Sequence, residues 1–91
     1  MTLQDALFNW LQIRIVADAR PLDEAAGKTI DFFEEILRED HGVSEFEKTE
    51  ADEYRLRIDY VRQGEKYSVF FDREHAERLL ADIGSNPKYN E

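Results

Sequence analysis

Two histidines, and two serines that lie in predicted strands, are the residues with which this chain could perform metal or nucleophilic chemistry. His41 and His75 each follow an acidic residue, a pairing of carboxylate and imidazole that metal sites use. Adjacent residues of a helix point in different directions, however, and the chain has no HExxH or similar ligand spacing. Ser44 and Ser68 lie neither in a nucleophile elbow nor beside a recognisable base. The pattern predicts solvated helix ends and no catalytic group.

The other residue types that carry chemistry are absent or scattered. There is no cysteine, which excludes disulfides, thiolate catalysis and cysteine-ligated zinc or iron–sulfur centres. The four glycines are dispersed and form no phosphate-binding loop. With 21 acidic residues among 91, carboxylate pairs arise by chance and identify no catalytic dyad. We therefore expect no enzymatic activity, no cofactor and no bound metal.

Residues 54–71 predict two alternating strands around a turn at Gln63 and Gly64. A two-residue loop places Arg62 opposite Glu65, and side-chain parity then fixes the other pairs. The apolar pairs share one face of the hairpin: Tyr60 with Tyr67, Ile58 with Val69, and Leu56 with Phe71. The opposite face carries Arg55, Arg57, Asp59, Ser68 and Phe70.

A long helix is predicted at the start of the chain. Thr2 followed by Asp5 resembles a capping box, and the apolar spacing continues the helix to about Ala19. Its apolar arc is unusually wide, because Phe8 and Ile15 extend it on one flank. Either this helix is the central element of the fold, or part of it contacts a second chain.

The second helix is expected to begin at Pro21, a residue suited to the first helical position. It is expected to end at His41 and Gly42, with the glycine in a left-handed cap. The break at Pro21 is short, which implies an αα-hairpin. The predicted apolar stripe comprises Leu22, Ala25, Ala26, Thr29, Ile30, Phe33, Ile36 and Leu37.

Residues 43–49 predict a strand that precedes the hairpin and joins it through a three-residue connection at 51–53. Glu50 would then face Tyr54, and Phe46 would meet Ile58 on the core face. Glu47 would meet Arg57 on the outside. A two-residue connection would instead send Phe46 to the charged face, so the odd-numbered loop is preferred.

A third helix follows the hairpin. Asp72 suits its N-cap, its apolar stripe runs from Ala76 to Ile83, and Gly84 is expected to end it. The order ααβββα predicts one α+β domain over residues 1–84: an αα-hairpin, a three-stranded antiparallel meander and a C-terminal helix, with 85–91 as a flexible tail. The predicted core contains Trp10, Leu11, Phe33, Leu37, Ile58, Val69 and Leu80.

Since no catalytic pattern is present, we expect a small intracellular protein-interaction or regulatory module. The wide flank of the first helix and the acidic end of the second helix are the interaction features. Both also have an ordinary explanation, because a central helix buries its flank and acidic helix faces are commonly solvated. The expected partner is another protein, basic if it meets the acidic helix end, or a second copy that forms a homodimer through the first helix. The candidate surface is Phe8, Ile15, Glu34, Glu35 and Glu39.

A single-stranded nucleic-acid-binding module is the alternative. Arg57 should face Phe70 across the hairpin, with Arg55 and Lys66 nearby, and a basic strand face with an aromatic side chain can stack a base. The single aromatic residue and the net charge of −9 argue against nucleic acid. A solvated face in which Arg57 covers Phe70 by a cation–π contact explains the same residues.

The composition places the chain among folded, highly charged domains. It is 42% hydrophobic and 36% charged, with a net charge of −9. The N-terminus lacks the basic region and cleavage site of a signal peptide, and no apolar run approaches the roughly 20 residues that span a bilayer. These features predict a cytoplasmic protein that does not bind membranes.

Three segments resemble an uncharacterised family of short acidic proteins from Bacillus-type bacteria. They are the opening MTLQDALFNWLQI, the segment DFFEEI at 31–36 and the ending NPKYN at 86–90. The resemblance spans nearly the whole chain but contains no functional motif. It implies a bacterial cytosolic protein and transfers no active-site residue.

Overall fold

The structure, a computed structural model, describes residues 1–85 and has the predicted element order ααβββα. The α+β fold class is therefore confirmed. Ser85 belongs to the last helix, so Gly84 does not end that helix as predicted and the predicted tail at 85–91 is wrong at its first residue; the rest of that tail, 86–91, lies outside the described residues. The elements are α1 (Leu3–Ala19), α2 (Glu24–Glu39), β1 (Val43–Glu50), β2 (Arg55–Arg62), β3 (Glu65–Asp72) and α3 (Arg73–Ser85).

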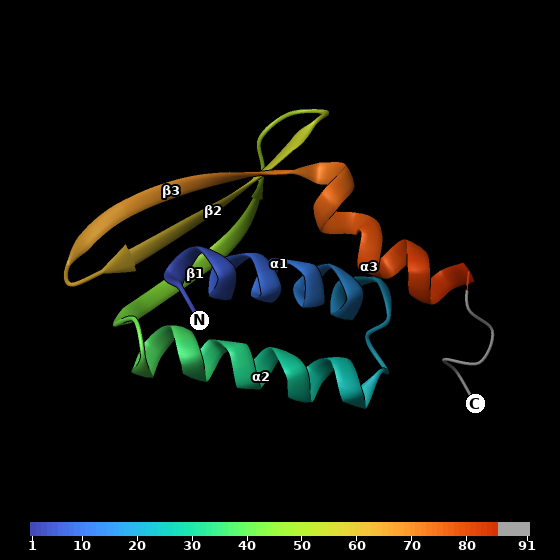
Figure 1. Ribbon diagram of the computed structural model, residues 1–91, viewed down its shortest axis with the longest axis horizontal. Helices are drawn as coiled ribbons and strands as arrows, with labels where there is room; N and C mark the ends of the chain where they lie inside the picture. The colour runs from blue at the N-terminus through green and yellow to red at the C-terminus, as the bar shows by residue number, and fades with distance from the viewer. Residues whose placement is uncertain (86–91) are drawn as a thin grey trace.

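Helix α1 is the central element of the fold (Figure 1). It lies between the sheet and α2, and it also contacts α3. The three strands form one antiparallel sheet in the order β1-β2-β3. Because α1 meets neighbours on several sides, its apolar arc is wide, as expected for the central-helix alternative.

The core divides into two clusters, both built around α1. The main cluster joins α1 to the sheet and includes the fully buried Leu11, Leu37 and Ile58. The second joins the C-terminal half of α1 to α2 and α3 through Val16, Ile30 and Ile83, among others. Of the seven predicted core residues, Trp10, Leu11, Leu37 and Ile58 are buried, whereas Phe33, Val69 and Leu80 are half-buried and pack against these clusters.

Helix α2 begins three residues later than predicted. Residues Arg20 to Asp23 form a turn in which the Asp23 N–H donates to the Arg20 carbonyl at 3.0 Å, with Pro21 second in the turn. Asp23 then caps α2 by accepting from the Ala26 N–H at 3.1 Å. Leu22 consequently points out of the fold with 94% of its surface exposed, and its assignment to the apolar stripe is wrong.

Other predicted helix ends are confirmed. Thr2 caps α1 by accepting from the Asp5 N–H at 3.1 Å. Asp72 accepts from the His75 N–H at 2.8 Å and caps α3. Gly42 follows α2 with a φ of 66° and donates its N–H to the Arg38 carbonyl at 3.2 Å, as a left-handed cap requires.

The register between β2 and β3 is the predicted one. Arg62 pairs with Glu65, Tyr60 with Tyr67, and the remaining pairs follow as expected from the two-residue loop. Gln63 and Gly64 both have positive φ, 53° and 81°, which is the backbone of a type I′ turn. The turn therefore holds one residue, Gln63, in a conformation that side chains other than those of Asn, Asp and Gly seldom adopt.

The turn yields a stability prediction. Replacing Gln63 by asparagine should raise the free energy of unfolding by about 0.5–1 kcal/mol, because asparagine tolerates the left-handed region better than glutamine. Urea denaturation would measure the change. Gly64→Ala is the opposing control: no atom obstructs a Cβ there, so its expected loss of about 1–2 kcal/mol comes from backbone strain alone. A loss of stability in Gln63→Asn would contradict the assignment of the strain to Gln63.

The predicted register between β1 and β2 is wrong by two residues. Phe46 pairs with Tyr60 instead of Ile58, and Glu50 pairs with Leu56. A shift of two keeps each side chain on its predicted face, so Phe46 still faces the core cluster. The connection is longer because the Asp52 carboxylate accepts two backbone N–H groups, from Tyr54 and Arg55, both at 2.8 Å.

Arg73 holds this longer connection in place from the first position of α3. Its guanidinium donates to the backbone carbonyls of Asp52 and Glu53 at 2.8 and 3.1 Å and to the Glu50 carboxylate. Its backbone N–H donates to the Tyr54 carbonyl at 2.8 Å. The loop therefore takes its shape from a residue about twenty positions away, which local sequence rules do not include.

Candidate protein-interaction surface

Within residues 1–85, the two histidines and the two strand serines do not all come together at one place. Ser44 and Ser68 line the same surface hollow, but neither histidine does. Ser68 Oγ donates to Asp59 Oδ1 at 2.7 Å, and the His75 ring packs against an aromatic ring elsewhere. Within residues 1–85, no group of three His, Asp or Glu side chains is placed to hold a metal ion.

Phe8 and Ile15, the predicted apolar flank of α1, pack within the fold. Both are half-buried against the main core cluster. The Phe8 ring lies 5.4 Å from the Phe71 ring and 4.7 Å from the His75 ring, centroid to centroid. These neighbours come from β3 and α3, so Phe8 serves the contact between α1 and these two elements.

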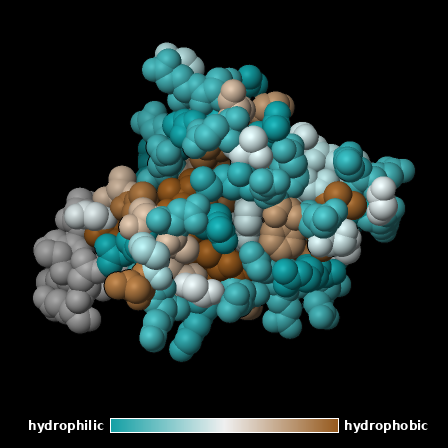
Figure 2. Space-filling view, turned by 180° about the vertical axis from the view of Figure 1, so that it is seen from behind, coloured by the Kyte–Doolittle hydropathy of each residue, from teal (hydrophilic) through white to brown (hydrophobic). Residues whose placement is uncertain are grey.

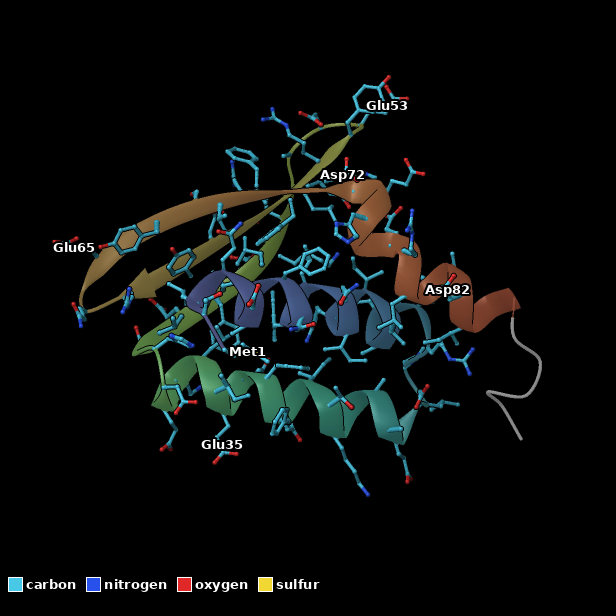
Figure 3. The ribbon with its side chains drawn as sticks, viewed as in Figure 1. Met1, Glu35, Glu53, Glu65, Asp72 and Asp82 are labelled. Carbon is cyan, nitrogen blue, oxygen red and sulfur yellow. The ribbon has the colours of Figure 1, made fainter. Side chains whose placement is uncertain are left out.

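The acidic residues predicted to extend this surface lie on another side of the molecule. Glu34 accepts from Trp10 Nε1 at 3.1 Å and pairs with Arg38 at 3.5 Å, so it joins α2 to α1. Glu35 and Glu39 are exposed, and Glu35 points away from α1 (Figure 3). The five predicted partner residues therefore do not form one continuous surface.

The outer face of the sheet, which we define as the face turned away from the helices, carries the residues of the nucleic-acid alternative. Arg57 pairs with Phe70 in the strand register as predicted. The guanidinium above the Phe70 ring, however, belongs to Arg55, at 4.6 Å from the ring centroid. The predicted cation–π contact from Arg57 is therefore wrong, because Arg57 turns to Asp59 instead, with its Nε 2.9 Å from Oδ1.

Asp59 organises the middle of the outer face. Its carboxylate accepts from Ser68 Oγ at 2.7 Å, Arg57 NH2 at 3.1 Å and Thr49 Oγ1 at 3.3 Å, which joins all three strands. The hydrogen bond from Ser68, followed by the hydrogen bond and charge of Arg57, lowers the pKa of Asp59 from its ordinary value. The folded state therefore favours the ionised carboxylate.

The lowered pKa of Asp59 predicts a pH-dependent contribution to stability. A carboxylate with a lower pKa in the folded state stabilises the fold above its unfolded pKa, and this contribution disappears as the pH falls through the folded value. Asp59→Asn should therefore be less stable than the wild type near neutral pH, and the difference should shrink below the ordinary aspartate value of 3.8. Urea midpoints of both proteins across this range would measure it. A difference that is independent of pH would contradict the prediction.

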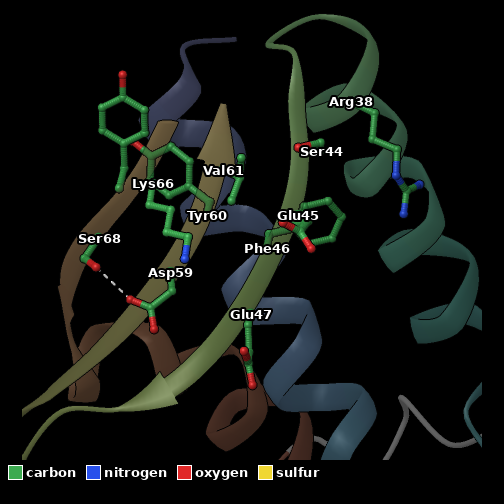
Figure 4. A pocket seen from close by; sticks show the side chains of 11 residues that line it. Arg38, Ser44, Glu45, Phe46, Glu47, Asp59, Tyr60, Val61, Lys66 and Ser68 are labelled. Carbon is green, nitrogen blue, oxygen red and sulfur yellow. Dashed lines mark hydrogen bonds between the residues drawn. The ribbon is translucent and has the colours of Figure 1, made fainter. Parts of the chain in front are cut away.

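A hollow of about 760 Å³ lies over the strands beside this network (Figure 4). It is open to solvent, and its lining includes Glu45, Glu47 and Asp59 together with Lys66 and Ser68. Glu45 and Glu47 make no ion pair among the described residues, and the basic side chains of Arg38 and Lys66 line the same hollow, so its lining carries charges of both signs. The serine–carboxylate pair in its lining, Ser68 with Asp59, belongs to the network that joins the three strands.

The sheet has two edge strands, β1 and β3, each of which pairs only with β2 within residues 1–85, and the free edge of β3 is the one beside the exposed aromatic residues. In the part of the chain that the structure describes, β3 pairs with β2 alone, and all eight of its residues take part in that pairing. A two-residue hairpin closes with a hydrogen-bonded pair, here Arg62 with Glu65, and hydrogen-bonded pairs alternate from there. Lys66, Ser68 and Phe70 therefore direct their backbone N–H and C=O groups toward the free edge.

Exposed aromatic side chains flank this free edge on both faces of the sheet. Phe70 lies on the outer face with 47% of its surface exposed, and Tyr67 lies on the inner face with 42% exposed. Tyr67 stacks on Tyr60 at 5.3 Å between ring centroids. The hairpin extends past the N-terminal end of α1, which is why Tyr67 stays exposed while Tyr60 still packs against the main core cluster (Figure 1).

Sequence reasoning placed Tyr67 and Phe70 on the correct faces but missed the free edge and the exposure of Tyr67. The signal for the edge was present, since the last strand of a meander always has one unpaired side. The exposure depended on how far α1 reaches along the sheet, which no local pattern shows. The face of the molecule seen from behind has no broad apolar patch, because hydrophilic side chains lie between its hydrophobic ones (Figure 2).

No helix within residues 1–85 has both the length and the apolar character needed to cross a bilayer. Comparison with protein-family models, curated proteins and solved structures finds no match to this chain. The resemblance to a family of Bacillus-type bacteria therefore stays a prediction based on the three quoted segments.

Proposed function

We propose that this protein is a protein-interaction module with no chemistry of its own, and that it binds through the free edge of β3. One observation carries the proposal: an unpaired strand edge is flanked on both faces by exposed aromatic rings, Phe70 and Tyr67. Cytoplasmic location, the absence of a cofactor and the absence of catalysis belong to the same proposal and rest on the sequence patterns above.

A free strand edge favours a protein partner in extended conformation. A strand added to β3 would hydrogen-bond to the backbone groups of Lys66, Ser68 and Phe70, which supplies affinity. Alternate side chains of the added strand would meet Phe70 on one face and Tyr67 on the other, which supplies specificity. Aromatic side chains with large exposed areas are also enriched among residues that dominate binding energy.

The nucleic-acid alternative has less support on the same surface. Arg57 is paired with Asp59 and Arg55 with Asp52, each at 2.9 Å, so both guanidinium groups are already neutralised. A base could stack on Phe70 only after displacing Arg55. Salt-sensitive binding of single-stranded RNA or DNA that is lost in both Arg57→Ala and Phe70→Ala would favour this alternative.

A pair of substitutions at one position tests the strand edge. Ser68→Pro removes a backbone N–H that faces the free edge, and it leaves the ladder to β2 intact. Ser68→Ala is the matched control, because both variants lose the hydrogen bond to Asp59 but only proline loses the N–H. In affinity capture from the source cell, wild type and Ser68→Ala should recover the same proteins, and Ser68→Pro should lose them.

Circular dichroism must first show that both variants are folded. Recovery of the same proteins by Ser68→Pro would exclude the β3 edge as the binding surface. A parallel capture with Phe8→Ala would test the earlier hypothesis of a surface on α1. Selective loss of partners there, with Ser68→Pro unaffected, would move the interface from β3 to α1.

A further inference from the structure

We infer that the free edge of β3 pairs with β3 of a second copy of this chain, in an antiparallel arrangement centred on Val69. This inference rests on the proposed function and names its partner. The two sheets would join into one continuous sheet across a two-fold axis, so that neither copy keeps an open β3 edge.

Charge complementarity selects both the partner and the register. The strand carries Glu65 and Lys66 at its start and Asp72 at its end, and by side-chain parity Lys66 and Asp72 lie on the outer face whereas Glu65 lies on the inner face. Antiparallel pairing centred on Val69 places Lys66 of each copy opposite Asp72 of the other, on the outer face. Centring on Ser68 instead places Lys66 opposite Phe70, and centring on Phe70 places Asp72 opposite Ser68. Only the Val69 register opposes unlike charges, which stabilises cross-strand pairs.

The geometry of the edge agrees with this register. Lys66, Ser68 and Phe70 direct both backbone groups outward, and pairing about Val69 matches Ser68 of each copy with Phe70 of the other and Lys66 with Asp72, whose carbonyl is engaged in the first turn of α3. The pairs of Ser68 with Phe70 are the hydrogen-bonded pairs that antiparallel strands require. Val69 then lies opposite itself in a non-hydrogen-bonded pair, and Tyr67 lies opposite Phe71 on the inner face.

The side chains are available for these contacts. Lys66 forms no ion pair within residues 1–85, and Asp72 uses only Oδ2 to cap α3. The exposed ring of Tyr67 would gain an apolar neighbour from the other copy. The net charge of −9 on each copy opposes association, so a weak dimer is expected, and added salt should strengthen it by screening this repulsion.

Single-cysteine variants test the register directly, because the natural chain has no cysteine. In a non-hydrogen-bonded pair the two Cα atoms are about 4.5 Å apart, within the range that a disulfide bridges. Val69→Cys should therefore form a disulfide-linked dimer under mild oxidation. Ser68→Cys and Phe70→Cys should not, because each would lie about 8 Å from its counterpart, beyond disulfide reach.

Sedimentation equilibrium of the full chain tests the association without any new thiol. Over about 1 µM to about 1 mM, wild type and Ser68→Ala should show a rising dimer fraction, and Ser68→Pro should stay monomeric. If Ser68→Pro does not fold, the three cysteine variants still decide the question. Equal cross-linking at positions 68, 69 and 70, or a dimer fraction that is the same in Ser68→Pro and Ser68→Ala, would overturn the inference.

The outcomes separate this inference from the proposed function. The wild type could stay monomeric and capture a cellular protein that Ser68→Pro does not capture. That result would support strand addition at β3 and exclude a second copy as the partner. Binding of such a protein that weakens with salt would identify a basic partner. A monomeric wild type whose captured proteins are unaffected by Ser68→Pro would remove both proposals.

Discussion

Replacing Leu11 by alanine should lower the free energy of unfolding by about 2–5 kcal/mol, a large fraction of the total stability of a small domain. Leu11 is fully buried in the main core cluster, at the point where α1 meets the sheet. Removing its side chain loses the transfer free energy of the buried carbons. It also leaves a cavity between α1 and the sheet, which the surrounding residues fill only in part. Urea denaturation followed by far-ultraviolet circular dichroism would measure the loss.

Leu22 provides a matched control, because the same substitution there removes a side chain that is 94% exposed. Leu22→Ala should change the free energy of unfolding by no more than about 0.5 kcal/mol. The comparison also tests the observed start of α2, since a helix beginning at Pro21 would place Leu22 on the apolar stripe. A large loss of stability in Leu22→Ala would show that Leu22 is buried after all.

Replacing Phe8 by aspartate should destabilise the fold by about 2–4 kcal/mol, because it removes a large half-buried ring and places a charge beside the core. The lost contacts are those to the rings of Phe71 and His75, which tie α1 to β3 and α3. Thermal and urea unfolding would report the change.

Phe32 is the corresponding control on a helix surface. It is 56% exposed and its ring packs on that of the neighbouring Phe33, so Phe32→Asp should cost about 1 kcal/mol or less. If Phe8→Asp were as stable as wild type and nevertheless lost its binding partners, Phe8 would belong to an interface. That result would favour the homodimer through α1 over the one through β3.

The sequence alone determined those features that depend on residues a few positions apart. Side-chain parity around the loop at Gln63 and Gly64 was sufficient for the whole register of β2 and β3, because a two-residue turn allows one pairing. Thr2 and Asp72 identified helix starts, since a capping side chain reaches only the first turn of its own helix. The element order, the faces of each strand and most of the core followed from these local periodicities.

Two local features were misjudged because stronger interactions competed with the expected ones. Pro21 suits a first helical position, but Asp23 provides a capping carboxylate and the intervening residues close a turn. The connection at 51–54 was predicted too short because the Asp52 carboxylate binds two N–H groups at its end and Arg73, distant in sequence, binds two of its carbonyl groups. Phe46 was still predicted on the correct face of the sheet, because the register error was an even number of residues.

The tertiary structure alone decided which surfaces remain open. Phe8 and Ile15 had the same apolar pattern whether they packed against the core of their own chain or against a second chain, and only the placement of α1 at the centre distinguished the two alternatives. Tyr67 was placed on the core face correctly, yet it stays exposed because the hairpin extends beyond α1. Periodicity fixes the direction in which a side chain points, whereas burial depends on whether another element reaches it, and that is set by the packing of the whole chain.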